Sequence, residues 1–310
     1  MPLNHQCKTL LELIAQQGMP DLSLMQVADA RAVREQQRLP PGPATQVRDH
    51  RIAGPGGELA IREYRPLDTT GTLGALVYFH GGGFVLGSLD SHDALCRQLT
   101  VDSGCAVLSV DYRLAPEHKF PRGIEDAYAA TCWVHEHARA LDVDPKRIAV
   151  GGDSAGGALA TAVAILVKRR RGPSLAFQLL LYPVTDLRSF DTPSYAENAT
   201  GYFLTASAMV WFRDHYLAGV ADRSDQLASP LGCDELHGLP PALIITAEYD
   251  PLRDEAEAYA RALHTAGVPC TLTRYDGAIH AFMSMYAYLE LGRAAVHEAA
   301  VALRKAIGSS

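Results

Sequence analysis

The chain of 310 residues is 48% hydrophobic and 20% charged, which is the composition of a folded, water-soluble protein and excludes a disordered or membrane-embedded chain. Its length suffices for one large α/β unit with an insertion. The formal net charge of −7 argues against a general nucleic-acid-binding protein, because phosphate contacts need a basic face.

The predicted elements begin with a helical segment. Apolar residues recur at helical spacing over residues 5 to about 37, and the Pro-rich stretch "RLPPGPATQ" at 38–46 ends the pattern. Strand and helix patterns alternate from there on. Strands are predicted at residues 47–53, 58–65, 73–80, 105–110, 147–152, 176–182, 242–248 and 269–275. Helices are predicted near residues 91–103, 123–140, 155–170, 253–266 and 286–307.

The later strands, such as "CAVLSV" and "ALIITAEY", are continuously apolar, as strands are when helices cover both faces of a sheet. The alternation predicts an α/β fold with a mostly parallel, doubly wound, eight-stranded sheet that is entered through a few antiparallel strands. The strand at 269–275 is a possible sheet edge, so a monomer and a homodimer both remain open. The basic run "KRRRG" at 168–172 is interpreted as the last turn of a helix in preference to a partner-binding patch.

Residues 184–232 interrupt the alternation, because they lie between two strand patterns and contain none of their own. A connection of this length is usually functional, so we expect a lid or cap. Its stretch "MVWFRDHYL" is helical in pattern and carries large apolar side chains. These side chains serve either a ligand pocket or the protein core, and the sequence does not separate the two.

A candidate nucleophile follows the strand "RIAVGG". The residues "GDSAGG" match G-x-S-x-G with Gly152, Ser154 and Gly156, and the helix pattern "ALATAVAILV" comes directly after them. In such a strand–turn–helix the serine needs a strained backbone that lifts its hydroxyl above the sheet, and the small neighbours let strand and helix approach. An ordinary capping serine is the alternative, which the match on both sides disfavours.

A serine hydroxyl is a weak nucleophile that needs a base, and the base needs an orienting acid. On this kind of sheet both are expected beyond the carboxyl ends of later strands, in the order Ser, Asp or Glu, His. Asp250 follows "ALIITAEY", and His280 lies in "DGAIHAF" between the last strand and the last helix. Asp250 is also a plausible helix N-cap. The competing acids are Glu248, Asp254, Glu255 and Asp276.

The stretch "HGGGF" at 80–84 ends the third predicted strand. Glycines there let backbone N–H groups turn toward the oxyanion of a tetrahedral intermediate, where one donor is worth about 3 kcal/mol. A phosphate-binding loop is disfavoured, because neither GxxxxGK[ST] nor GxGxxG is present. The N–H of Ala155, which follows the serine, is expected to be the further donor.

Five ordered motifs carry a family resemblance: "HGGGF", "YRLAPEHKFP" (112–121), "GDSAGG", "DPLRDE" (250–255) and "DGAIHAF" (276–282). Together they resemble the hormone-sensitive-lipase-like branch of the α/β-hydrolases, the bacterial family IV esterases. The resemblance implies an α/β-hydrolase fold with a helical cap. Ala281 departs from the family pattern, which often has glycine after the histidine. The second motif has no chemistry of its own, and its Pro116 and Pro121 are interpreted as shaping the chain through cis bonds.

The resemblance also implies roles for individual residues. Ser154 is the implied nucleophile, Asp250 the orienting acid and His280 the general base, and the oxyanion donors are the N–H groups of Gly82, Gly83 and Ala155. The implied cap combines an N-terminal segment, residues 1–45, with the insertion 184–232. The catalytic domain is then formed by 46–183 and 233–310. The residues expected to contact substrate are Phe84, Asp153, Phe203, Leu204, Met209, Trp211 and Phe212.

These observations predict a serine carboxylesterase for small esters of short to medium acyl chains, which requires no metal or cofactor. An amidase or peptidase on the same residues is the alternative, and a non-catalytic small-ligand receptor is a second. The six cysteines form no CxxC pair, which predicts neither a zinc site nor a disulfide framework. The N-terminal residues lack a secretion-signal pattern. We therefore expect a cytoplasmic protein that binds neither nucleic acid nor membrane.

Overall fold

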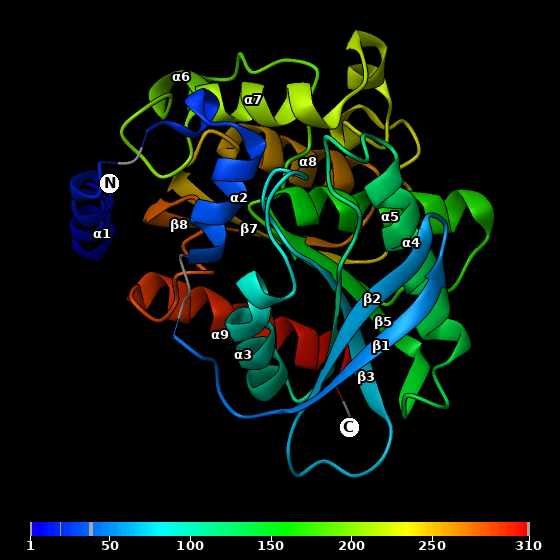
Figure 1. Ribbon diagram of the computed structural model, residues 1–310. Helices are drawn as coiled ribbons and strands as arrows, with labels where there is room; N and C mark the ends of the chain where they lie inside the picture. The colour runs from blue at the N-terminus through cyan, green and yellow to red at the C-terminus, as the bar shows by residue number, and fades with distance from the viewer. Residues whose placement is uncertain (1, 19, 37–39, 309–310) are drawn as a thin grey trace.

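An eight-stranded sheet runs through the centre of the computed structural model, which describes residues 2–18, 20–36 and 40–308 (Figure 1). The strands lie in the order β1-β2-β4-β3-β5-β6-β7-β8. Their bounds are β1 (Gln46–Gly54), β2 (Gly57–Arg65), β3 (Leu73–Phe79), β4 (Ala106–Val110), β5 (Val143–Asp153), β6 (Phe177–Leu181), β7 (Ala242–Tyr249) and β8 (Cys270–Ile279).

Most of the sheet is parallel. β3 pairs in parallel with both β4 and β5, and the pairing from β5 through β8 is parallel throughout. β1 and β2 form an antiparallel hairpin, and β2 joins β4 in antiparallel orientation. The predicted architecture of a mostly parallel sheet with an antiparallel entry is therefore confirmed. Parallel pairing also brings the carboxyl ends of β3, β5, β7 and β8 to one edge, where ligands bind in folds of this kind.

Helices cover both faces of the sheet (Figure 1). One buried cluster packs α4, α5 and α8 on one face, and a second packs α1, α3 and α9 on the other. The bounds of these six helices are α1 (His5–Gln16), α3 (Asp93–Ser103), α4 (Arg122–Glu136), α5 (Ala155–Arg170), α8 (Arg253–Thr265) and α9 (Glu290–Ile307). Burial from both sides explains why β3, β4 and β6 are apolar at nearly every position.

Two strands extend beyond their predicted ends. β5 begins at Val143, because Val143 pairs with Leu73 ahead of a shift in register. β8 continues to Ile279, because its pairing with β7 resumes at Tyr249 after another irregularity. Gly277 lies in that stretch with a φ of +76°. β8 is an edge strand, as the sequence suggested.

The helical pattern predicted over residues 5–37 is divided into separate helices. The described part of it forms α1, a short 3-10 turn η1 (Leu22–Leu24) and α2 (Val27–Gln36). Gly18 adopts a φ of +65°, and the Asp21 carboxylate accepts the N–H of Ser23 at 2.8 Å, which starts the new turn. Residues 19 and 37 of that prediction, and residues 38 and 39 of the break that follows, lie outside the described residues.

The insertion at 184–232 is helical, with α6 (Pro193–Glu197) and α7 (Ala206–Tyr216) followed by the short turns η3 (Val220–Ser224) and η4 (Pro230–Gly232). It lies beside the N-terminal segment at the same side of the molecule (Figure 1). The hydroxyls of Thr205 and Ser207 donate to the Asp21 carboxylate at 3.0 and 3.2 Å. Two segments far apart in the sequence thus meet above one edge of the sheet.

Arg31 fastens α2 to the rest of the protein. Its Nε donates to the Val85 carbonyl oxygen at 3.0 Å, and its Nη2 donates to that of Ala115 at 2.8 Å. The guanidinium also forms a bidentate ion pair with the Glu117 carboxylate, with N–O distances of 2.7 and 2.8 Å. One side chain therefore holds α2 against two loops.

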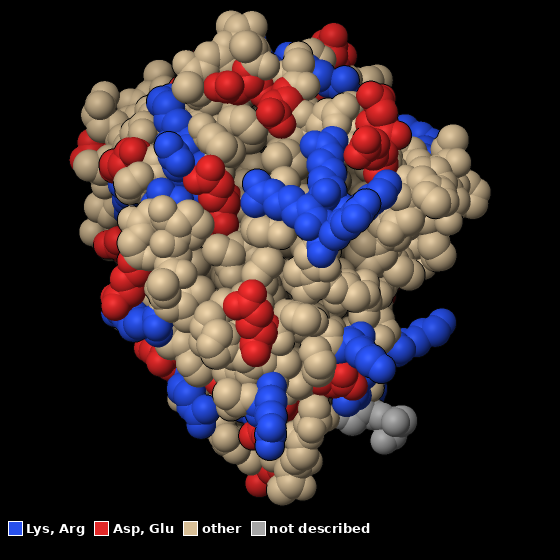
Figure 2. Space-filling model, turned by 90° about the vertical axis from the view of Figure 1, so that its right-hand side faces the viewer, with Lys and Arg blue, Asp and Glu red and all other residues tan. Residues whose placement is uncertain are grey.

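The predicted basic end of α5 is confirmed, and its charges serve contacts within the chain. Lys168 Nζ donates to the Glu235 carbonyl oxygen at 2.8 Å, and the Arg170 guanidinium lies 4.7 Å from the centre of the Tyr128 ring. Figure 2 shows one face on which acidic and basic side chains are interspersed, with one group of basic side chains gathered together. Among the described residues, no helix is both long and apolar enough to cross a membrane.

Replacing Arg31 by alanine should loosen α2. Arg31 keeps 29% of its side chain exposed, so we expect a local loss of about 1–2 kcal/mol, below the sum of its contacts. Limited proteolysis under native conditions should then cut residues 2–36 faster than in the unmodified protein. Arg48→Ala, at an exposed position of β1, is the control. Equal cleavage rates in both variants would contradict the assignment.

Candidate active site

Ser154 occupies the sharp turn between β5 and α5. Its φ of +56° and ψ of −118° lie in a region that side-chain-bearing residues rarely adopt. A Cβ atom on Gly152 or on Gly156 would lie 2.3 or 1.9 Å from the Phe79 carbonyl oxygen, so only glycine fits at either position. The close approach of strand and helix is thus the reason for the G-x-S-x-G spacing, and it lifts the Ser154 hydroxyl above the sheet.

His280 and Asp250 complete a chain of hydrogen bonds with this serine. His280 Nε2 lies 3.0 Å from Ser154 Oγ, and Nδ1 lies 2.6 Å from Asp250 Oδ2. Ser154 follows β5, Asp250 follows β7 and His280 follows β8. In the same order, the three residues are 8%, 0% and 5% exposed. A hydroxyl, an imidazole and a carboxylate linked in this order can produce a serine nucleophile at neutral pH.

Residues 80–84, the glycine loop, follow β3. Gly82 and Gly83 have φ values of +123° and +62°. A Cβ atom on Gly82 would lie 2.2 Å from the Leu86 carbonyl oxygen, and one on Gly83 would lie 2.0 Å from the Phe212 ring. Within the described ranges, no protein acceptor pairs with the N–H of Gly82, Gly83 or Ala155. These backbone donors near Ser154 are available to an anion.

The Asp153 carboxylate anchors the glycine loop. It accepts the Tyr78 hydroxyl at 2.6 Å and the Gly81 N–H at 2.9 Å, and His92 Nε2 lies 3.2 Å away. Burial by itself would raise the pKa of Asp153, but His92 and the hydrogen bonds outweigh it and hold that pKa well below its usual range. The sequence suggested that Asp153 contacts substrate; in the structure its carboxylate contacts the groups that support the loop.

His80 supports the loop from within. Its Nδ1 lies 2.9 Å from the Gly81 carbonyl oxygen, and its ring stacks on Tyr112 at 4.4 Å. The Tyr112 hydroxyl donates to the His80 carbonyl oxygen at 2.7 Å. Burial, with a smaller contribution from His92, lowers the pKa of His80 to about 3, so the ring is uncharged at neutral pH.

The segment 112–121, for which the sequence offered no chemistry, is a second support of the loop. The Ala115 N–H donates to the Phe84 carbonyl oxygen at 2.9 Å. Pro116 and Pro121 both follow cis peptide bonds, as the sequence suggested.

Known proteins share this fold. A family described as "alpha/beta hydrolase fold" matches residues 76–284, which is more than half of the chain. The chain is a member of the α/β-hydrolase family. The resemblance seen in the sequence motifs is therefore confirmed.

Several relatives of this α/β-hydrolase have names that refer to esters. The carboxylic ester hydrolase LipN of Mycobacterium tuberculosis is 47% identical over 79% of this chain and 67% of its own length. The esterase LipI of the same organism is 43% identical over 88% and 86% of the two chains. A thermostable esterase of known structure from Pseudomonas putida superposes with a TM-score of 0.96, at 40% identity, and covers 100% of this chain and 99% of its own.

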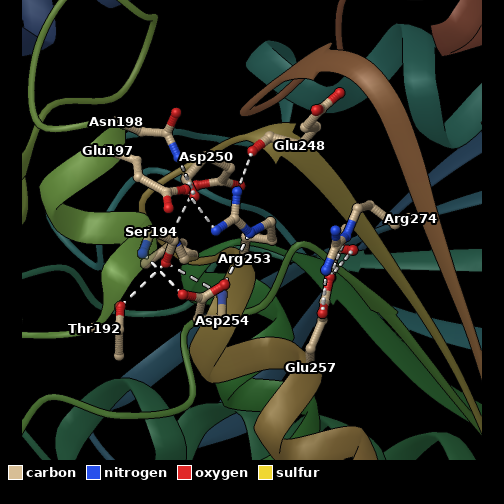
Figure 3. Close-up of polar contacts among 12 residues, drawn as sticks. Thr192, Ser194, Glu197, Asn198, Glu248, Asp250, Arg253, Asp254, Glu257 and Arg274 are labelled. Atoms are coloured by element: carbon tan, nitrogen blue, oxygen red, sulfur yellow. Dashed lines mark hydrogen bonds and ion pairs between the residues drawn. The ribbon is translucent and has the colours of Figure 1, made fainter. Parts of the chain in front are cut away.

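Helix α6 holds the loop that carries Asp250 in this α/β-hydrolase (Figure 3). The Ser194 hydroxyl donates to the Pro251 carbonyl oxygen at 2.6 Å, and the Ser194 N–H donates to Asp254 at 2.8 Å. Asp250 Oδ1 accepts the N–H of Leu252 at 2.9 Å, so the carboxylate caps this turn while Oδ2 faces His280. Asp250 is therefore not the N-cap of α8, which is Leu252; it caps the turn before this helix while it faces the imidazole.

Other acids near Asp250 are engaged elsewhere. Asp254 pairs with Arg253 at 2.8 Å, and Glu248 accepts the Gly277 N–H at 2.6 Å (Figure 3 shows Asp254 and Glu248). Glu255 accepts the N–H groups of Thr185 at 2.7 Å and Asp186 at 3.1 Å. None of these three is bonded to His280, which leaves the imidazole to Asp250.

The side chains expected to contact substrate have different surroundings. Leu204, Met209, Trp211 and Phe212 are buried, and Phe212 lies directly against Gly83. The Phe84 ring is also buried and stacks on Tyr216 of α7 at 3.8 Å. Phe203 is 37% exposed, so it is not part of this buried group.

Tyr78, His92 and Tyr182 were not found from the sequence. Tyr78 and His92 reach Asp153 from 75 and 61 residues away, and the Tyr182 ring lies 4.9 Å from that of His280. No local pattern marks such contacts. Ala281 does carry a signal, since its φ of +62° is one that glycine adopts readily, and glycine is what the family resemblance led us to expect there.

The buried Glu255 makes the stability of the folded protein depend on pH. The side chain is buried, and burial raises its pKa to about 8 although two backbone N–H groups oppose the shift. The unfolded chain has a Glu pKa of about 4.3, so between these values the folded protein holds a proton that the unfolded chain has lost. The contribution of Glu255 to stability is therefore complete below about pH 4 and disappears as the pH rises to about 8.

Glu255→Gln should remove this dependence. Between about pH 5 and 8 the free energy of unfolding of the variant should fall less steeply with rising pH than that of the unmodified protein. The difference in slope should be up to about 1.4 kcal/mol per pH unit, because glutamine does not titrate. Urea unfolding at several pH values measures it. Glu12→Gln, at an exposed position, should keep the original slope. An unchanged slope in the Glu255 variant would refute the assignment.

Proposed function

We propose that this α/β-hydrolase is a serine carboxylesterase that cleaves short- to medium-chain acyl esters through an acyl-enzyme intermediate. The hydrogen-bonded chain from Ser154 through His280 to Asp250 carries the proposal. The names of its relatives, among them an ethyl acetate hydrolase of Pseudomonas putida that is 44% identical, support esters as the substrate class.

In the first half-reaction the Ser154 oxygen attacks the ester carbonyl carbon and its proton passes to His280 Nε2, which lies 3.0 Å away. The tetrahedral intermediate collapses when the bond to the alcohol oxygen breaks. His280 returns its proton to that oxygen, and the alcohol leaves. The acyl group stays bound to Ser154 as an ester.

In the second half-reaction water takes the place of the alcohol. His280 removes a proton from the water, whose oxygen attacks the acyl carbon, and the proton then returns to Ser154 as the acid departs. Asp250, 2.6 Å from Nδ1, keeps the imidazole in the orientation that both steps require and stabilises its protonated form.

Negative charge develops on the carbonyl oxygen in both tetrahedral intermediates. The N–H groups of Gly82, Gly83 and Ala155 are the proposed donors to it. Their lack of protein acceptors in the described ranges supports this role. The fixed backbone dipoles need no reorganisation when the charge appears.

We propose further that residues 1–45 and 184–232 form a cap over a catalytic domain made of 46–183 and 233–310. The hydrogen bonds of Asp21 with Thr205 and Ser207 support a joint cap, and the low exposure of Ser154 and His280 supports a covered site. Leu204, Met209, Trp211 and Phe212 are the proposed apolar walls. A covered site of this kind disfavours long acyl chains.

Ser154→Ala should abolish turnover of 4-nitrophenyl butanoate, with kcat lower by at least about 10⁴-fold, because no other described group replaces the nucleophile. Thermal unfolding should show that the fold is intact. Ser189→Ala, at an exposed position of the insertion, is the matched control. An alkylphosphonate ester should add its mass to the Ser154 peptide of the unmodified protein, and labelling of another serine would refute the assignment.

Acyl-chain length tests the cap. 4-Nitrophenyl butanoate should have a higher kcat/KM than the corresponding hexadecanoate, because the buried walls limit the room for the chain. Both rates are measured in the same detergent-containing buffer. An equal or higher value for the hexadecanoate would refute the proposed preference and leave the nucleophile assignment unaffected.

A further inference from the structure

Arg34 comes from the N-terminal segment and lies close to the proposed active site. It is one helical turn beyond Arg31, which bonds the carbonyl oxygens of Val85 and Ala115. Residues three apart share one face of a helix, so Arg34 lies on the face of α2 that packs toward the end of the glycine loop.

The electrostatic interactions of Arg34 indicate which groups of the proposed active site lie near it. Its charge interacts with Asp153 and Tyr182, and also with His80. Asp153 directly precedes Ser154, and the Tyr182 ring lies 4.9 Å from the His280 ring. The guanidinium is therefore within electrostatic range of groups on both sides of the serine–histidine pair.

Arg34 has no bonded anionic partner in the described part of the chain. Among the described residues it forms neither an ion pair nor a hydrogen bond, and no residue outside that part of the chain has an acidic side chain. Asp153 is near, but its carboxylate is already occupied by Tyr78, Gly81 and His92. The contrast with Arg31, which is paired with Glu117, is clear within a single helix.

Protein nevertheless shields this charge. Desolvation lowers the pKa of Arg34 from its ordinary value by more than the field of Asp153 raises it, while the side chain remains only partly exposed. A shielded cation without a bonded anion is costly to a folded protein. An anion that enters with the substrate would supply the missing partner.

We propose that Arg34 binds a carboxylate carried by the substrate, so that the enzyme selects esters with an anionic group in their acyl or alcohol part. A guanidinium offers two parallel N–H donors that match the two oxygens of a carboxylate. The chain as a whole has a net charge of −7 and repels anions, so a local cation is needed to accept one. Arg34 is then a specificity residue for the proposed esterase reaction, on which this inference rests.

Two pairs of esters test the proposal, one for each end of the substrate. The acyl arm compares 4-nitrophenyl hydrogen adipate with 4-nitrophenyl hexanoate, which has the same acyl chain without the carboxylate. The alcohol arm compares 4-(butanoyloxy)benzoate with its methyl ester. The readout is the ratio of kcat/KM for the anionic ester to that for the neutral one, which cancels general effects of a substitution on the enzyme.

Arg34→Gln should lower this ratio by at least about tenfold in one of the two arms, and Arg34→Lys should restore part of it, because lysine keeps the charge without the planar fork. Arg48→Gln, at an exposed position of β1, is the matched control and should leave the ratio unchanged. An unchanged ratio for Arg34→Gln in both arms would overturn the proposal. An equal loss in the Arg48 variant would also do so.

Inhibition of the unmodified protein gives a second test that does not depend on a folded variant. Adipate should inhibit hydrolysis of 4-nitrophenyl butanoate more strongly than hexanoate does, and equal or weaker inhibition by adipate would count against Arg34. Neutral-ester turnover separates the two proposals. If the neutral esters are hydrolysed but the Arg34 variant leaves the kcat/KM ratio unchanged, only the proposed specificity is refuted. If no ester is hydrolysed, the esterase assignment itself is refuted.

Discussion

Asp153 carries a buried negative charge at the junction of β5, β3 and the glycine loop. A carboxylate in such a place is tolerated only when donors surround it, and Tyr78, Gly81 and His92 provide them. Because Asp153 adjoins Ser154, the hydrogen bond to Gly81 fixes the distance between the serine and the neighbouring backbone N–H groups. The geometry proposed for oxyanion binding therefore depends on this one ionised group.

The remaining supports of the site come from outside the central strands. The segment 112–121 bonds the glycine loop, Arg31 of α2 fastens the same region from above, and α6 holds the loop that carries Asp250. These elements belong to, or contact, the two segments proposed as the cap. Movement of the cap would thus alter the positions of the proposed catalytic groups as well as access to them, because both depend on the same hydrogen bonds.

Local patterns were sufficient for the sheet and for the residues at its carboxyl edge. Continuous apolar runs predict strands buried on both faces, and Ser154 and Asp250 each follow such a run. His280 instead follows the edge strand β8, whose sequence alternates polar and apolar residues. The break in the N-terminal helical pattern was missed. Gly18 and the Asp21 turn interrupt it, and their effect on the helix outweighs the apolar spacing on either side.

The sequence by itself determined the fold class, the order of the strands and helices along the chain, and the serine, acid and histidine that meet at one edge of the sheet. These three residues could be found because the strand ends of a parallel sheet converge whatever their separation in sequence. Only the tertiary structure decided what surrounds them. It showed that Asp153 faces the loop, that Phe212 fills the space beside Gly83, and that Arg34 has no hydrogen-bonded or ion-paired partner among the residues described. These facts depend on contacts between distant segments, and such contacts arise from packing, which no local pattern records.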